Sequence, residues 1–134
     1  MIDRDAFLTA YIECALWSSN DMTDESGGDP LDANYDESDL AEETRASMKK
    51  DCDDFIDANE KLLEKAHQTR MSKRTSNTYD ESYSGHDFWL TRNGHGAGFW
   101  DRGLGAVGEQ LSNAARVYGS VDLYVGDDEL IHSS

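Results

Sequence analysis

The densest group of reactive side chains lies in residues 86–102, HDFWLTRNGHGAGFWDR. Its candidate catalytic residues are His95, Arg92, Asn93 and Asp101. Histidine titrates near neutral pH and can transfer a proton, arginine and asparagine can stabilise an oxyanion, and aspartate can orient the imidazole. A structural role fits equally, since closely spaced glycines suit an irregular turn and an Asp–Arg pair can fix a hairpin. The group indicates, as one alternative, a small hydrolase or transferase.

A second group could supply the oxygen ligands that a hard cation needs. Five residues fall at positions 1, 3, 5, 7 and 12 of a calcium-loop pattern, namely Asp32, Asn34, Asp36, Ser38 and Glu43. Glu37 stands where the pattern requires glycine, and Asp39 replaces the usual apolar residue. Phosphate-loop, hydrolase-elbow and zinc-protease motifs are absent, and Cys14 and Cys52 lack metal-ligand spacing. We therefore expect no metal, no cofactor and two buried, reduced thiols.

The charge of the chain narrows the class of partner. Its 134 residues include 28 acidic and 12 basic side chains, a formal charge of −16. Such a surface repels a polyanion, so we expect no direct nucleic-acid binding. Apolar runs fall short of the roughly 20 residues that span a membrane, and the first residues lack a signal-peptide pattern. The acidic residues are concentrated in the first half of the chain. Residues 1–68 carry a net charge of −13, and residues 20–43 hold ten acidic and no basic side chains.

The acidic half is predicted to contain two helices. Residues 3–18 have a broad apolar stripe behind a possible cap at Asp3. Residues 39–66 keep a helical stripe for about seven turns, and Asp39 and Glu42 match a capping box. These two helices are the elements that would carry most of the charge.

Two polar segments separate the predicted elements. Residues 20–38 contain two adjacent glycines and the only proline, and we expect a loop there. Residues 67–85 are rich in Ser and Thr and read as a polar linker. This linker holds the only local basic cluster, Arg70, Lys73 and Arg74, which is typical of a solvated loop.

The remaining residues, 86–134, are predicted to form a ββαββ unit. The expected elements are a hairpin over 86–102, a helix over 104–118 ending at Gly119, and strands at 121–125 and 129–132. The aromatic residues Trp89, Phe99, Trp100 and Trp17 are expected to pack in one core. The order ααββαββ predicts a single α+β domain over 1–134, with the two N-terminal helices packed on a small antiparallel sheet and one further helix.

Much of the chain resembles a family of small, mostly uncharacterised proteins of tailed bacteriophages and prophages. The resemblance rests on a C-terminal signature, DFWLTRNGHGAGFWDRG, within residues 85–131, and on ALWSS (15–19) and DPLDANYD (29–36). It implies a phage protein acting in the cytoplasm of the infected bacterial host. It supplies no activity and no site residue.

These observations favour an acidic binding protein over an enzyme. A dense array of carboxylates can imitate the phosphates of a nucleic acid and occupy the basic groove of a host defence or DNA-processing enzyme. The expected partner-binding residues are Asp29, Asp32, Asp36, Glu37, Asp39, Glu42 and Glu43. Two alternatives stay open: an enzyme centred on the His95 hairpin, and a self-associating protein that pairs through the strand edge 121–131. Simple hydration of an acidic surface is the third possibility, and the oligomeric state is not predicted.

Overall fold

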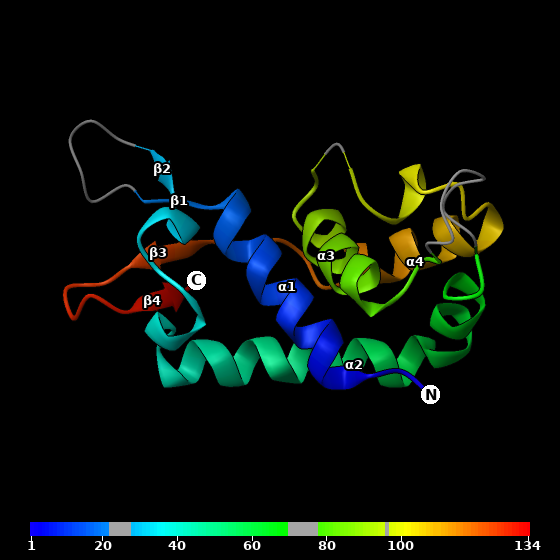
Figure 1. Ribbon diagram of the computed structural model, residues 1–134, viewed down its shortest axis with the longest axis horizontal. Helices are drawn as coiled ribbons and strands as arrows, with labels where there is room; N and C mark the ends of the chain where they lie inside the picture. Colours follow the sequence, from blue (N-terminus) through cyan, green and yellow to red (C-terminus); the bar gives the residue numbers. More distant parts are fainter. Residues whose placement is uncertain (22–27, 70–77, 96) are drawn as a thin grey trace.

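The computed structural model describes residues 1–21, 28–69, 78–95 and 97–134, without the side chain of Asp101. These residues form a mostly helical α+β fold with two small two-stranded antiparallel sheets (Figure 1). In chain order the elements are α1 (Arg4–Ser18), β1 (Asn20–Asp21), β2 (Asp29–Pro30), the 3-10 turns η1 (Leu31–Ala33) and η2 (Glu37–Asp39), α2 (Glu42–Ala66), α3 (Glu81–Arg92), the 3-10 turn η3 (Phe99–Asp101), α4 (Ala106–Arg116), β3 (Leu123–Val125) and β4 (Ile131–Ser133). The α+β class is as expected, but the order ααββαββ is wrong.

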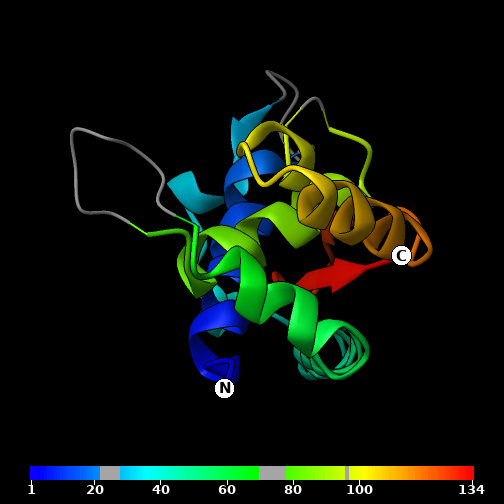
Figure 2. The same cartoon turned by 90° about the vertical axis from the view of Figure 1, so that its right-hand side faces the viewer.

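The long helix α2 supports the other three helices. It runs along the long axis of the molecule, α1 crosses it, α3 lies beside α1, and α4 packs against α2 and α3 (Figure 1). Figure 2 looks along the first part of α2 and shows α1, α3 and α4 on one side of it. The β3–β4 hairpin and the β1–β2 pair lie at the same end as the start of α2 (Figure 1).

The two predicted N-terminal helices are present. Asp3 caps α1 by accepting a hydrogen bond from the backbone N–H of Ala6 at 3.0 Å. The capping box predicted from Asp39 and Glu42 is wrong, because Asp39 ends η2 and accepts instead from the N–H of Asp36. The next two residues are extended and buried, so α2 begins only at Glu42 and has no side-chain cap.

The hairpin predicted over residues 86–102 is wrong, since its first half belongs to α3. Asp80 starts this helix by accepting from the N–H of Ser82. Phe88, Trp89 and Leu90 are all buried in succession. A short helix that is buried on several sides shows no helical period, and such an apolar run resembles a strand in sequence.

The predicted linker 67–85 is also shorter than expected, because α3 already begins at Glu81. Tyr79, just before the helix, is completely buried. The basic cluster Arg70, Lys73 and Arg74 lies outside the described residues.

An aromatic core joins three helices and η3. The rings of Phe55 on α2 and Phe88 on α3 are stacked, with centroids 4.1 Å apart. Phe7 on α1 and Phe99 on η3 pack against the Phe55 ring at 6.2 and 5.8 Å. Trp89 is buried as predicted, whereas Trp17 and Trp100 are 58% and 54% exposed and the prediction that they complete the core is wrong.

The C-terminal part follows the prediction more closely. Helix α4 lies within the expected range 104–118, and Gly119 after it has the positive φ of 73° that favours glycine. Strands β3 and β4 pair as an antiparallel hairpin. They do not form a larger sheet with strands from 86–102, and β4 instead bridges to Leu40 in parallel at Ile131.

We predict that Gly85→Ala disrupts the contact between α1 and α3. A Cβ atom at position 85 would lie 2.1 Å from the carbonyl oxygen of Phe7 and 3.0 Å from the Cβ of Ala10, so the two helices must separate. We expect a loss of about 1–3 kcal/mol in the free energy of unfolding, measured by urea titration. The control Ser47→Ala on the exposed face of α2 should change it by less than about 0.5 kcal/mol. Equal stability of Gly85→Ala and wild type would contradict the packing.

Candidate functional site

The acidic segment 28–43 is held on the core by a few apolar residues. Leu31 is completely buried, and Leu40 and Ala41 are nearly so. The N–H of Leu31 donates to the carbonyl of Ser19 at 2.8 Å, and the N–H of Tyr35 donates to the carbonyl of Leu31 at 2.9 Å. The prediction of a loop over residues 20–38 is therefore refined: its described part contains two short strands and two 3-10 turns with fixed backbone contacts.

The carboxylates of this segment point outward and are mostly not neutralised. Six of the seven predicted partner-binding residues are exposed, and Asp39 is half-buried. Within the described part of the chain, the single ion pair that involves any of the seven joins Glu37 to Arg45 at 3.8 Å. Both side chains of that pair are about half exposed, so it contributes no more than about 1 kcal/mol.

The C-terminal hairpin adds three further acidic residues to the same end. The N–H of Ala41 donates to the carbonyl of Ile131 at 2.9 Å, which ties β4 to the acidic segment. Partial loss of hydration raises the pKa of the Tyr35 phenol, and the charges of Asp21, Glu129 and Asp39 raise it further. Carboxylates from three separate segments therefore contribute to the electrostatic potential at Tyr35.

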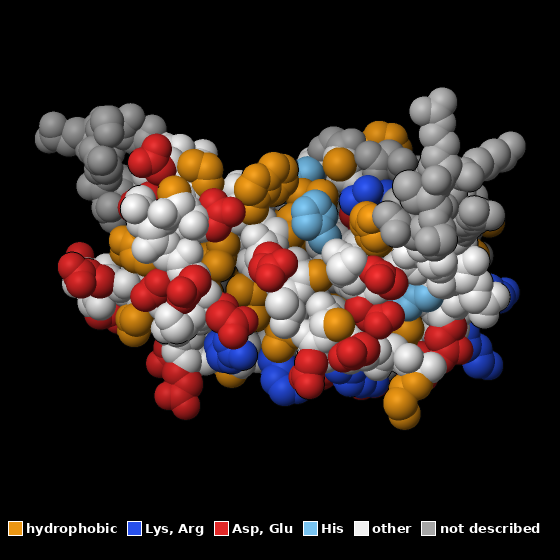
Figure 3. All heavy atoms as spheres, viewed as in Figure 1, with side chains coloured by type: hydrophobic (Ala, Val, Ile, Leu, Met, Phe, Trp, Pro, Cys, Tyr) orange, Lys and Arg blue, Asp and Glu red, His pale blue; other side chains and the backbone are white. Residues whose placement is uncertain are grey.

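We call this surface the acidic end. It is composed of Asp29, Asp32, Asp36, Glu37, Asp39, Glu42, Glu43, Asp127, Asp128 and Glu129. Figure 3 shows acidic side chains at this end and also across the rest of the visible face, while most Lys and Arg side chains lie along the lower edge. Sequence analysis missed the last three members, because only the bridge between Leu40 and Ile131 brings them here.

The acidic residues of α2 from Asp51 onward differ from those of the acidic end because most of them have ion-pair partners. Arg4 contacts Asp53 and Asp57, and Lys49 donates to Asp53 at 2.8 Å. The hydrogen bond from Lys49 is the largest cause of the lowered pKa of Asp53, and Arg4 lowers it further. Lys50 pairs with Asp54 in the same way. The large negative charge of residues 1–68 is thus neutralised along α2 and concentrated at the acidic end.

The calcium-loop residues do not converge on a common point. The carboxylate of Asp36 accepts from the backbone N–H and the hydroxyl of Ser38, which lowers its pKa. The backbone N–H of Asn34 closes η1 by donating to Leu31. Across the described ranges, no group of three or more His, Cys, Asp or Glu side chains is arranged to hold a metal ion.

Two of the candidate catalytic residues around His95, Arg92 and Asn93, form hydrogen bonds within the protein. The guanidinium of Arg92, whose side chain is 3% exposed, donates to Asp51 at 2.8 Å and to the hydroxyl of Tyr11 at 3.0 Å. Asn93 donates to the carbonyl of Trp89 and accepts from the N–H of Val121. His95 is exposed and lines a small cleft with Asn93, while the side chain of Asp101 lies outside the described residues.

The rest of the signature region also makes internal contacts. Asp87 is completely buried and binds the guanidinium of Arg102 through both oxygens, with the Tyr79 hydroxyl donating to it at 2.7 Å. Glycine is required at position 98, because a Cβ there would lie 2.2 Å from the hydroxyl oxygen of Thr91 and φ is 152°. These contacts give Asp87, Gly98 and Arg102 a structural reason for their types.

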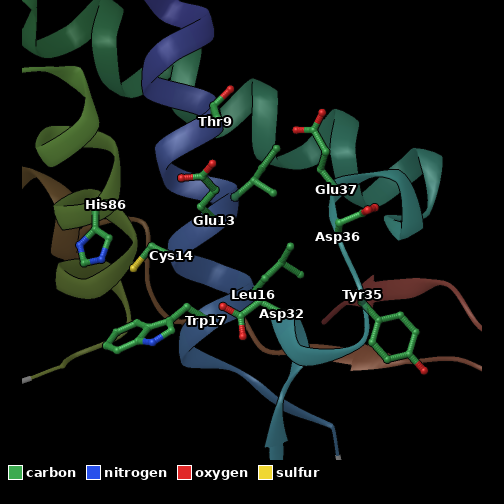
Figure 4. Close-up of a pocket in the computed structure, with 11 residues that line it drawn as sticks. Thr9, Glu13, Cys14, Leu16, Trp17, Asp32, Tyr35, Asp36, Glu37 and His86 are labelled. Carbon is green, nitrogen blue, oxygen red and sulfur yellow. The ribbon is translucent and has the colours of Figure 1, made fainter.

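A groove lined by described residues adjoins the acidic end. It has a volume of about 660 Å³ and lies between α1, the segment from η1 to η2, and α3 (Figure 4). Glu13 and Trp17 on α1 line it, together with Asp32, Glu37 and His86. Figure 4 shows Asp32 directed toward the α1 side of the groove, whereas Asp36 and Tyr35 point away from α1. Sequence analysis did not identify this groove.

The Cys14 thiol, which lines the groove, is not activated as a nucleophile. Cys14 is buried, and burial, together with the charge of Asp87, raises the pKa of its thiol to about 12. Burial raises the pKa of the Cys52 thiol as well. Both cysteines are free and buried, as predicted.

Comparison of the chain with protein families, with curated proteins and with solved structures finds no match in any of the three. Among the described residues, no helix has the length and apolar character needed to cross a bilayer.

We predict that Arg92→Ala mainly destabilises the protein. The substitution leaves Asp51 and the Tyr11 hydroxyl without their partner and removes the cation that lies 5.7 Å from the centre of the Phe88 ring. Breaking such a buried pair costs about 3–5 kcal/mol, which thermal and urea unfolding can measure. Arg116→Ala is the matched control, because Arg116 is exposed on α4 and contacts only Asn113 among the described residues. A variant at position 92 with wild-type stability would contradict the structural role.

Proposed function

We propose that this protein binds a basic, nucleic-acid-binding protein through the acidic end and occupies the groove that would otherwise hold the nucleic acid. One observation carries the proposal: ten carboxylates lie at one end of the molecule on a backbone fixed by buried residues. Within the described residues, only Glu37 and Asp128 of the ten have ionic partners, Arg45 and His132.

The separation of paired from unpaired carboxylates supports a docking role. A surface that is acidic only for hydration gains nothing from concentrating its charge. A concentrated negative patch instead produces a local potential that steers a positive partner toward one face and raises the association rate. Because exposed charges are screened beyond about 8 Å at physiological salt, the carboxylates must lie close together to act jointly.

The anchoring of the acidic end supports affinity as well as rate. Leu31 and Ile131 are completely buried, and Leu40 is nearly so. A segment that is already ordered does not lose its backbone freedom on binding, so less of the interaction energy is spent on ordering. A nucleic-acid mimic benefits from this property, since the positive groove of its partner is built for regularly placed phosphates.

The resemblance to phage proteins supplies the biological setting of the proposal. In the cytoplasm of an infected bacterium, the partner would be a host defence or DNA-processing enzyme, or a basic protein of the phage. An acidic protein that occupies the nucleic-acid groove of such an enzyme would inhibit it.

The proposal predicts that reversing charges at the acidic end abolishes capture of DNA-binding proteins. The test variant replaces Asp32, Glu42 and Glu43 by Lys, all exposed residues that form no ion pair within the described part of the chain. The immobilised wild-type protein should capture bacterial lysate proteins that elute with excess duplex DNA and with 0.5 M salt. The variant should capture them at least about tenfold less, as quantified by mass spectrometry.

The control variant replaces Asp5, Glu60 and Glu109 by Lys. It has the same net charge as the test variant, −10, because each replacement changes −1 to +1. Only the placement of the charge differs, so the control should capture nearly as much as the wild type. The proposal is wrong if both variants lose capture equally, or if duplex DNA does not compete for the captured proteins.

A further inference from the structure

We infer that the groove beside the acidic end receives an arginine side chain of the partner protein. This inference rests on the proposed function, because it assumes a basic protein bound at that end. It adds the chemistry of one anchoring contact: a guanidinium stacked on Trp17 and bound by the carboxylates of Glu13 and Asp32.

Thr9, Glu13 and Trp17, from the C-terminal part of the exposed stripe of α1, form the floor of the groove. Seven residues of this helix are buried, while Asp5, Thr9, Glu13 and Trp17, spaced four apart, are exposed along one side. Trp17 is 58% exposed although it is the largest apolar side chain of the helix. An exposed tryptophan inside a groove with charged walls is typical of a binding site, since the ring gains stability only when a partner covers it.

The walls of the groove are negative. Glu13, Asp32, Asp36 and Glu37 line it, and none of the described lining residues is Lys or Arg. Glu13 and Asp32 form no ion pair within the described part of the chain. Figure 4 shows Glu13 and Trp17 on α1 and the side chain of Asp32, from η1, directed toward that helix. A cationic group is therefore favoured there over an anionic or a neutral one.

The aromatic ring favours a guanidinium over an ammonium. The guanidinium is planar, stacks on an indole face and donates two parallel hydrogen bonds to one carboxylate, whereas lysine presents a strongly hydrated point charge. The ring of His86 lies 6.2 Å from that of Trp17 at an angle of 33°, so it flanks the indole. The volume of about 660 Å³ lies within the range of pockets that bind small molecules, so the groove is large enough for an arginine side chain.

The acidic end and the groove share residues, which makes a common partner reasonable. Asp32, Asp36 and Glu37 belong to both. Figure 3 shows the visible face hollowed next to the acidic end, with apolar side chains in the hollow and acidic ones around it. A basic surface docked on the acidic end thus brings its arginines to the edge of the groove.

Nuclear magnetic resonance of the whole protein tests this inference with small probes. The chain has three tryptophans, so the indole N–H signal of Trp17 can be assigned with Trp17→Phe. The probes are N-acetyl-arginine methylamide and the matched lysine and citrulline compounds at constant ionic strength. The arginine probe should shift the Trp17 signal in a saturable way. The dissociation constant of the lysine probe should be at least about threefold higher, and the neutral citrulline probe should not bind. Equal shifts with citrulline and arginine, or an unmoved Trp17 signal, would overturn the inference.

Substitutions separate this inference from the proposed function. Trp17→Ala should weaken binding of the arginine probe about tenfold, and Glu13→Gln should weaken it about threefold. Trp100→Ala, which removes a similarly exposed tryptophan on η3, is the control and should not change binding of the probe. Trp17→Ala should also capture about tenfold less of the DNA-competed lysate proteins. If its capture and its unfolding are unchanged, the arginine anchor is wrong and the acidic-end proposal stands. If the charge reversals at Asp32, Glu42 and Glu43 leave capture unchanged, the proposed function itself fails.

Discussion

The burial of a few apolar side chains holds together a segment whose charges repel one another. Leu31, Leu40 and Ile131 anchor the acidic end, and burying each such side chain stabilises by about 1.5–3 kcal/mol. Two carboxylates 4 Å apart in water repel by about 1 kcal/mol, and salt screens more distant pairs. Burial therefore exceeds local repulsion, and the backbone rather than the charges decides where the carboxylates lie. The proposed docking role depends on this balance.

The described acidic residues of the chain fall into two groups, those with cationic partners and those without. Along α2 they alternate with Lys and Arg at positions that allow ion pairs, such as Lys49 with Asp53, and these pairs cancel the local potential. At the acidic end the chain offers almost no cations. The groove along α1 continues the negative surface and adds an exposed indole, so that one region combines long-range attraction with a specific site for a side chain. Attraction alone would give a fast but unselective association, and the indole supplies selectivity.

Much of the fold could be predicted from periodicity, and the failures have physical causes. Helices α1, α2 and α4 have one polar side, so their apolar residues recur at helical spacing. Helix α3 is buried on several sides, and a run such as Phe88, Trp89 and Leu90 carries no period that distinguishes a helix from a strand. The parallel bridge between Leu40 and Ile131 joins residues far apart in the sequence, and no local pattern indicates it.

The candidate site was predictable in part for the same reasons. Local composition identified the acidic segment 28–43 but not the acidic residues of the C-terminal hairpin. The exposure of Trp17 did have a signal: Asp5, Thr9 and Glu13 precede it at intervals of four, so Trp17 continues the polar side of α1. The close spacing of reactive residues around His95 suggested a catalytic site, yet Arg92 and Asn93 form hydrogen bonds that stabilise the fold.

The central claim is that the acidic end is fixed in the free protein, and amide hydrogen exchange tests it most directly. The amides of Leu31, Tyr35 and Ala41 each donate to a backbone carbonyl, those of Ser19, Leu31 and Ile131 respectively. At low salt and without a partner, the account predicts that these amides exchange at least roughly a hundredfold more slowly than in an unfolded chain. Exchange at the unfolded rate, with the core amides of α1 and α3 protected, would contradict it.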